Sequence, residues 1–140
     1  MNMRVPIQSG PRESKKPKLV YIVHPFRSDP EENRKKIIEI CRRIHSERIV
    51  PFAPYIAGTF YLSDSDEKQR KMAMDMSRLI FSRSSVDEAW VFGEHISEGM
   101  AFEVRIALQK GIPIICKSGA IRRDLMRLVR KRGLAAKTSN

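Results

Sequence analysis

Apolar and polar residues follow one another along the chain in blocks that match buried strands and amphipathic helices. Short apolar runs rich in β-branched and aromatic side chains predict four strands, at residues 19–23, 49–53, 89–92 and 112–116. Longer segments with apolar residues at helical spacing predict four helices, at about residues 31–47, 66–83, 97–110 and 121–131. Strands and helices therefore alternate over the whole of this region.

Such alternation with short connections is typical of an α/β protein whose parallel sheet is covered by helices on both faces, a three-layer sandwich. A common strand order for such a fold is 2-1-3-4, which leaves room for a fifth strand. Ligands of these sheets bind beyond the carboxyl ends of the strands, where the strand order reverses. In this order the loops at residues 24–29 and 93–100 face each other across the crevice. The sequence thus predicts one α/β domain over residues 19–131 with a ligand site at that point.

The two ends of the chain differ from this domain in composition. Residues 1–18 contain three prolines and no apolar periodicity, and we expect them and residues 132–140 to be disordered tails. The net charge is +11, of which residues 1–18 carry +4 and residues 117–140 carry +7, so the remaining stretch is neutral. Basic ends are usually solvated and less often bind polyanions. A nucleic-acid-binding protein that uses its basic tails is therefore one alternative function.

Cysteine usage and hydropathy indicate the compartment. Cys41 and Cys116 each lie in an apolar stretch, with neither the CxxC spacing nor the histidine cluster of a metal site. No apolar run approaches the roughly 20 residues that span a bilayer, and the N-terminus lacks the apolar core of a signal peptide. We therefore expect a cytoplasmic protein with free thiols, no metal, no cofactor and no membrane partner.

The segment at residues 93–104 carries the most chemical information. Ser97 is a good N-cap for the third predicted helix, and Gly99 lets a ligand approach the backbone closely. Free amides at a helix start favour an anion. Glu103 follows in the second turn among apolar neighbours such as Met100, with no basic residue three or four positions away. Because an unpaired carboxylate on an apolar helix is costly to bury, we interpret Glu103 as functional rather than as a solvent-facing helix residue.

The pattern Ser-x-Gly-Met-x-x-Glu at residues 97–103 follows an aromatic-rich strand and precedes Gly-x-Pro-Ile-Ile at residues 111–115. This arrangement resembles the nucleoside 2-deoxyribosyltransferase superfamily. Within it, the chain is more similar to the 2′-deoxynucleoside 5′-phosphate N-hydrolases and to related phage and bacterial proteins. The strand and loop at residues 20–25 also resemble the start of that family's domain. The resemblance covers roughly residues 19–118.

Several expectations follow from this resemblance. It implies a flavodoxin-like, Rossmann-like fold, a homo-oligomer of two or more chains, and Glu103 as the nucleophile. It also implies an assisting role for Asp75, and contact between Ser97 and the 5′-phosphate of a substrate. Taken by itself, Asp75 could equally form a solvated ion pair, because Lys71 and Arg78 lie at helical spacing from it.

Four further residues complete the predicted ligand site. Tyr21 could turn its hydroxyl to the sugar or pack in the core, and His24 lies on the first of the two facing loops. Arg27 can bind phosphate in a fork, and Ser118 could add a hydroxyl from the same chain or a partner chain. The combined hypothesis is hydrolysis or transfer at the N-glycosidic bond of a (deoxy)nucleoside 5′-monophosphate through a glutamate nucleophile. A non-catalytic nucleotide-binding or sensing module on the same fold is the second alternative.

Overall fold

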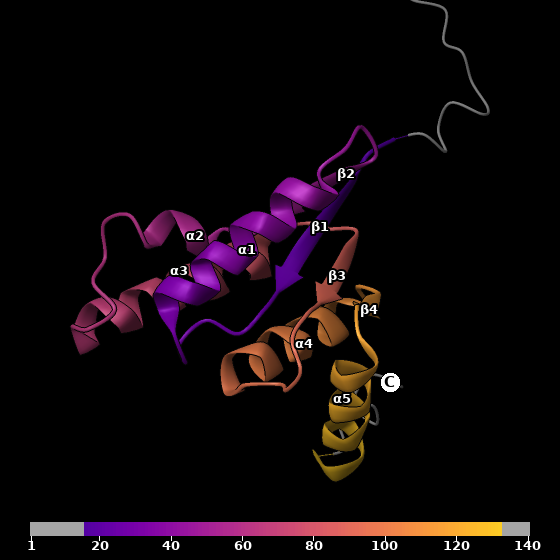
Figure 1. The fold of residues 1–140 in the computed structure, drawn as a ribbon. Coiled ribbons are helices and arrows are strands. Elements are labelled where there is room, and N and C mark those ends of the chain that lie inside the picture. The colour runs from indigo at the N-terminus through magenta and orange to yellow at the C-terminus, as the bar shows by residue number, and fades with distance from the viewer. Residues whose placement is uncertain (1–15, 133–140) are drawn as a thin grey trace, which may run out of the picture.

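The apolar runs predicted as strands form the centre of the computed structural model, which describes residues 16–132. The strands are β1 (Lys18–Val23), β2 (Ile49–Phe52), β3 (Glu88–Val91) and β4 (Ile114–Cys116). The helices are α1 (Pro30–Ile44), α2 (Tyr55–Gly58), α3 (Glu67–Arg83), α4 (Glu98–Lys110) and α5 (Gly119–Arg132). All strand pairs are parallel, and the order across the sheet is β2-β1-β3-β4 (Figure 1). The predicted α/β class and strand order are confirmed.

The expected disordered tails fall largely on residues 1–15 and 133–140, which lie outside the described residues. At the inner borders, Lys18 already pairs in β1 and Arg132 still belongs to α5. Between residues 16 and 132 the sheet has four strands, so the fifth strand that the order would accommodate is not found there. In the same part of the chain, no helix has both the length and the apolar character needed to cross a membrane.

Burial on both faces of β1 produces the three layers. Successive side chains of a strand point to opposite faces, and the four residues from Val20 to Val23 are all fully buried. Tyr21 and Val23 share a core cluster with apolar residues of α3, α4 and α5, whereas Val20 and Ile22 share another with residues of α1. A continuous apolar strand is therefore the centre of a sandwich, as its composition predicts.

Side-chain caps set the starts of the long helices. Asp29 accepts a hydrogen bond from the Glu32 amide at the start of α1, and Ser97 accepts one from the Met100 amide at the start of α4. Gly111 ends α4 with a left-handed φ of 72°, a conformation that costs little without a Cβ atom. The predicted cap at Ser97 and the predicted end of this helix at residue 110 are confirmed.

The connection between β2 and α3 contains the one-turn helix α2. Tyr55 begins it and donates a hydrogen bond of 2.6 Å from its hydroxyl to the Ile22 carbonyl oxygen in β1. This contact ties the segment to the carboxyl end of the sheet. A single turn is too short to show helical periodicity, which explains why the apolar pattern does not predict it.

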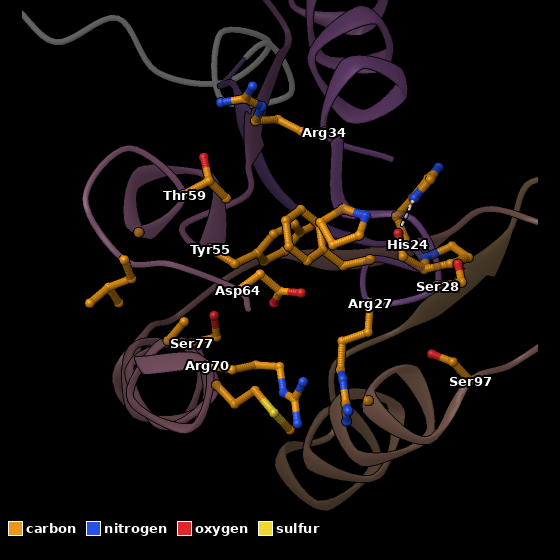
Figure 2. A pocket seen from close by; sticks show the side chains of 18 of the residues that line it. His24, Arg27, Ser28, Arg34, Tyr55, Thr59, Asp64, Arg70, Ser77 and Ser97 are labelled. Carbon is orange, nitrogen blue, oxygen red and sulfur yellow. Dashed lines mark hydrogen bonds between the residues drawn. The ribbon is translucent and has the colours of Figure 1, made fainter. Parts of the chain in front are cut away.

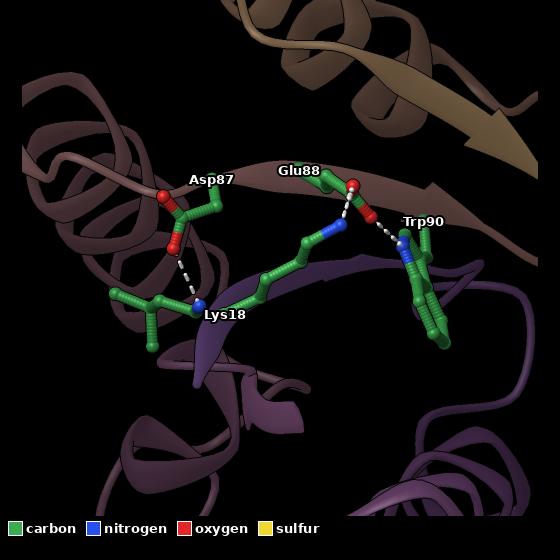
Figure 3. Close-up of polar contacts among 5 residues, drawn as sticks. Lys18, Asp87, Glu88 and Trp90 are labelled. Carbon is green, nitrogen blue, oxygen red and sulfur yellow. Dashed lines mark hydrogen bonds and ion pairs between the residues drawn. The ribbon is translucent and has the colours of Figure 1, made fainter. Parts of the chain in front are cut away.

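Polar contacts join β1 and β3 at the amino-terminal ends of these strands (Figure 3). The Lys18 ammonium lies 2.8 Å from the Glu88 carboxylate, which also accepts a 2.8 Å hydrogen bond from the Trp90 indole. Asp87 accepts a hydrogen bond from the Leu19 amide at 2.8 Å. These bonds support the parallel register of the two strands between which the strand order reverses.

Truncating Phe81 tests the inferred core. Its ring is fully buried and lies parallel to that of Tyr21, with centroids 3.9 Å apart. Phe81→Ala should lower the free energy of unfolding by about 3–5 kcal/mol through lost burial and a residual cavity. Leu79→Ala on the same helix, where the side chain is 49% exposed, should cost less than about 1 kcal/mol. Urea denaturation of both variants measures this, and equal losses would contradict the assignment of Phe81 to the core.

Candidate functional site

A cavity of about 570 Å³ opens at the carboxyl ends of β1 and β3 (Figure 2). Its walls come from the loop after β1, the start of α1, the segment from α2 to α3, and the first turns of α4. The two facing loops expected from the strand order thus contribute to one cavity. Six of the residues singled out in the sequence line it: His24, Arg27, Ser97, Gly99, Met100 and Glu103.

Glu103 is bonded to the sheet through Tyr21. The Tyr21 hydroxyl donates a hydrogen bond of 2.6 Å to Glu103 Oε2, while the other carboxylate oxygen makes no hydrogen bond to the described residues. Tyr21 itself is fully buried, and desolvation raises the pKa of its hydroxyl well above the ordinary value. Of the two alternatives considered for Tyr21, the structure shows core packing, and its hydroxyl bonds to the candidate nucleophile while Tyr21 itself is not among the cavity residues.

The surroundings of Glu103 favour its neutral form. Burial raises its pKa from 4.5 to about 8, although the Tyr21 hydrogen bond and the positive charge of Arg78 both lower it. The carboxyl is therefore mostly protonated at neutral pH in the free protein. A carboxyl group with such a shift on a cavity wall is typical of catalytic sites.

Arg78 is held beside this carboxyl by an aromatic ring. Its guanidinium carbon lies 4.0 Å from the centroid of the Phe102 ring, and both residues line the cavity. The sequence pattern indicated Arg78 only as a neighbour of Asp75. Its role at the cavity follows from the packing of α3 against α4, which no local signal in the sequence shows.

Asp75 does not lie in the cavity, which is a correction to the role that the resemblance implies. Its side chain is 52% exposed, and its carboxylate lies 2.8 Å from the Lys71 ammonium one turn earlier in α3. This hydrogen bond to Lys71 lowers the pKa of Asp75. The neighbouring Met74 and Ser77 line the cavity instead, because only part of the α3 surface faces it. Asp75 therefore has the geometry of the solvated ion pair that its spacing also allowed.

Ser118 caps α5 and is not among the cavity residues. Its hydroxyl donates to the Gly93 carbonyl oxygen at 3.0 Å and accepts from the Ile121 amide at 3.1 Å. Gly93 has a φ of 110°, and a Cβ atom there would approach the Pro25 ring to 3.2 Å. Within one chain, Ser118 thus supports the loop that precedes α4 and does not contact the cavity.

The start of α4 presents its backbone to the cavity. The first-turn amides of a helix have no acceptor within the helix, and a side chain added at Gly99 would meet nothing within 4 Å. Ser97 uses its oxygen as the cap, which leaves its hydroxyl proton free to donate to a ligand. Met100 is 1% exposed and mainly fills the core beneath this turn.

The loop between β1 and α1 carries the other predicted ligand residues. His24 Nδ1 lies 2.7 Å from the Pro25 carbonyl oxygen, and burial lowers the pKa of its ring, so the neutral form with a proton on Nδ1 fits this contact. Asn33, a buried residue of α1, donates to the Phe26 carbonyl and to the Ser28 hydroxyl, both at 3.1 Å. These bonds hold the Phe26 backbone and the Ser28 side chain on either side of Arg27, whose exposed side chain reaches the cavity.

The helices supply cavity residues that sequence reasoning missed. Besides Arg78, the clearest are Arg34 on α1 and Arg70 and Ser77 on α3. Each lies within an amphipathic helix, where the local pattern does not distinguish a cavity wall from a solvated face. In the part of the chain that the structure describes, no three His, Cys, Asp or Glu side chains gather as a metal site would require.

The raised pKa of Glu103 makes stability depend on pH. The unfolded chain loses this proton near pH 4.5 and the folded protein near pH 8, so the unfolded state binds fewer protons between these values. This group should therefore lower the free energy of unfolding as pH rises from 4.5 to 8, by up to about 1.4 kcal/mol per pH unit.

Urea titrations of wild type and Glu103→Gln across this range measure the difference. The variant should gain stability relative to wild type toward pH 8. A constant difference between the two proteins would mean that the Glu103 pKa is not raised.

Comparison with protein families identifies one match. A family model described as "Domain of unknown function (DUF7768)" matches residues 18–117, which comprise the whole sheet and helices α1 to α4. The searches of curated proteins and of solved structures found no match. The match covers most of the chain and includes all the cavity residues, and the protein therefore belongs to the DUF7768 family.

Proposed function

We propose that this protein cleaves the N-glycosidic bond of a (deoxy)nucleoside 5′-monophosphate, with Glu103 as the nucleophile and water or a second base as the acceptor. The observation that carries the proposal is the Glu103 carboxyl itself. It lies on the wall of a cavity of suitable size, one oxygen is held by Tyr21, and burial raises its pKa. The sequence resemblance to the nucleoside 2-deoxyribosyltransferase superfamily supports the same chemistry.

The proposed reaction has two steps. The ionised Glu103 oxygen that Tyr21 does not hold attacks C1′ of the sugar, and the bonding electrons of the N-glycosidic bond leave with the base, which takes up a proton from water. The transition state resembles an oxocarbenium ion, whose positive charge a close carboxylate stabilises. Water then attacks C1′ and releases the sugar phosphate from Glu103, or a second base attacks and a new nucleoside phosphate forms.

Two contacts prepare Glu103 for this role. The Tyr21 hydrogen bond and the nearby Arg78 guanidinium favour the ionised carboxylate over the neutral acid, against the effect of burial. The Tyr21 bond also fixes the orientation of the carboxyl, since the Tyr21 backbone belongs to β1 and its ring is stacked on that of Phe81. A poorly solvated carboxylate in a fixed position interacts strongly with positive charge developing at C1′.

The other end of the cavity suits a phosphate group. Ser97 can donate its hydroxyl proton, the first-turn amides of α4 face an anion favourably, and Arg27 reaches the cavity from the opposite loop. We further propose that the protein is cytoplasmic and acts as a homo-oligomer, on the grounds of its sequence.

Two other functions can be distinguished from this one by experiment. A non-catalytic nucleotide-binding or sensing module would bind the same ligand at Arg27 and Ser97 without releasing base. A nucleic-acid-binding protein would use the basic ends, and α5 does present four arginines on one side, Arg122, Arg123, Arg127 and Arg130. Binding to DNA or RNA that weakens steeply with salt and needs those arginines would favour the nucleic-acid-binding function.

Glu103→Gln should abolish base release from 2′-deoxynucleoside 5′-monophosphates while changing ligand affinity by less than about threefold. Glutamine preserves the shape of the side chain but cannot form the glycosyl ester, so the loss falls on the transition state. Chromatographic detection of free base measures turnover, and calorimetric titration measures affinity.

Asp75→Asn is the matched control, because it neutralises a carboxylate on α3 that lies outside the cavity. This variant should release base at the wild-type rate within about twofold. Base release by Glu103→Gln within a few-fold of wild type would exclude Glu103 as the nucleophile.

The proposed phosphate site, formed by Arg27, Ser97 and the first turn of α4, predicts that nucleotides bind more tightly than nucleosides. One or two charge-assisted hydrogen bonds of about 1.5–3 kcal/mol each give at least about tenfold tighter binding of a 5′-monophosphate than of its nucleoside. Arg27→Ala and Ser97→Ala should each reduce this ratio without removing turnover. Titration of both ligand classes against wild type and the two variants decides the matter, and equal affinities in wild type would mean that no phosphate site exists at this end of the cavity.

A further inference from the structure

Two polar residues on one face of α3 line the cavity, and the proposed function so far uses neither of them. Arg70 and Ser77 are seven residues apart, so they lie on the same side of the helix about two turns from each other. Figure 2 shows both on one side of the cavity, across from the loop that carries Arg27. This face of α3 is therefore a wall with a hydroxyl at one end and a guanidinium at the other.

The Ser77 hydroxyl is buried without a partner. Ser77 is 8% exposed, and its hydroxyl makes no hydrogen bond to any residue between 16 and 132. Asn33, the other buried polar side chain among these residues, has both of its donor bonds satisfied. Because a buried hydroxyl without a partner is unfavourable, and this one borders a cavity, a ligand in the cavity would supply the partner it lacks.

Ser77 belongs to the part of α3 that packs against the residues around the candidate nucleophile. It precedes Phe81 by one helical turn, and the Phe81 ring is stacked on Tyr21, whose hydroxyl bonds to Glu103. Arg78, the next residue in α3, is packed on Phe102 next to Glu103 in α4. The part of a ligand that meets Ser77 is therefore the part that lies beside Glu103, which in a nucleotide is the sugar.

Arg70 lies at the other end of this wall and is available for an anion. Its side chain is 27% exposed, and its ion-pair partner Glu67, 3.4 Å away, is itself 87% exposed, so the pair is weak. Figure 2 shows the Arg70 side chain extending toward α4, as that of Arg27 does from the opposite side. Two guanidinium groups directed into one region repel each other unless an anion lies between them.

We propose that α3 forms a second ligand-binding wall, in which Ser77 hydrogen-bonds the sugar of the bound nucleotide and Arg70 joins Arg27 on its 5′-phosphate. This inference rests on the proposed function and specifies its substrate class. A terminal phosphate monoester carries close to two negative charges at neutral pH, since its second pKa is about 6, whereas a phosphodiester carries one. Two arginines therefore select a free mononucleotide over a nucleotide within a nucleic-acid strand.

The test measures binding to proteins that carry Glu103→Gln, so that turnover does not interfere. The probes are the tightest-binding of the four common 2′-deoxynucleoside 5′-monophosphates, its parent deoxynucleoside, and its 5′-methyl phosphodiester. Arg70→Gln is compared with Lys68→Gln, an exposed cation in the same helix. Ser77→Ala is compared with Ser82→Ala, whose exposed hydroxyl bonds to the Leu79 carbonyl oxygen.

Arg70→Gln should weaken binding of the monophosphate about tenfold and leave that of the deoxynucleoside unchanged, which removes the preference for monoester over diester. Ser77→Ala should weaken binding of all three probes by a similar factor of about five, because every one of them contains the sugar. The melting temperature of Ser77→Ala should not fall, since the change removes an unpaired buried hydroxyl. Lys68→Gln and Ser82→Ala should bind all three probes like the parent protein.

An Arg70→Gln protein that binds like the Lys68→Gln control, or a Ser77→Ala protein that binds like the Ser82→Ala control, would overturn the proposed wall. If none of the four monophosphates binds, the proposed wall is overturned as well. Failure of the proposed function gives a different result, namely no release of base by the wild-type protein while binding still depends on Arg70 and Ser77.

Discussion

The hydrogen bond of 2.6 Å between the Tyr21 hydroxyl and Glu103 connects the core of this protein to its cavity. Tyr21 lies in the central strand β1, fully buried, and its ring is stacked on Phe81 of α3. The bond crosses from the sheet to α4, so the position of the carboxyl depends on the packing of three elements at once. A substitution in the core at Phe81 would therefore change the position of the Glu103 carboxyl through Tyr21.

The same packing explains how a carboxyl group can be kept in an unfavourable place. Burial raises the pKa of Glu103 to about 8, which means that its ionised form is less stable here than in water. The buried carboxyl lowers the free energy of unfolding, and the apolar core around Tyr21 and Val104, both fully buried, offsets this loss. Sites in which a fold maintains a destabilised group are typically functional, because the group interacts more strongly with a ligand than with the empty cavity.

The sequence predicts the fold and part of the cavity for identifiable physical reasons. The continuous apolar run from Leu19 to Val23 indicates a doubly covered strand, and Ser97 and Gly111 mark the ends of α4. The strand order then brings the loop of Arg27 to the start of α4. Glu103 is distinctive in the sequence because it has no charged partner at helical spacing on its own helix.

What the sequence does not predict depends on how helices rotate about their axes. The residues of α3 show this most clearly, since Asp75 faces solvent with Lys71 while Ser77, two positions later, faces the cavity. Local periodicity does not distinguish these orientations when a helix carries polar residues on several sides, as α3 does. The one-turn helix α2 is not predicted for a different reason, since a single turn shows no periodicity and Tyr55 is positioned by a long-range bond to the Ile22 carbonyl oxygen.

The pH dependence of base release by the wild-type protein tests the role of Glu103 most directly. Measuring kcat/KM between pH 7 and 10 keeps the phosphate of a nucleotide predominantly in its dianionic form and reports the protonation states of the free protein. A nucleophilic Glu103 predicts that kcat/KM rises with pH and levels off above an apparent pKa of about 8. A kcat/KM that falls through this range would show that the protonated carboxyl acts instead as an acid, and would contradict a nucleophilic role for Glu103.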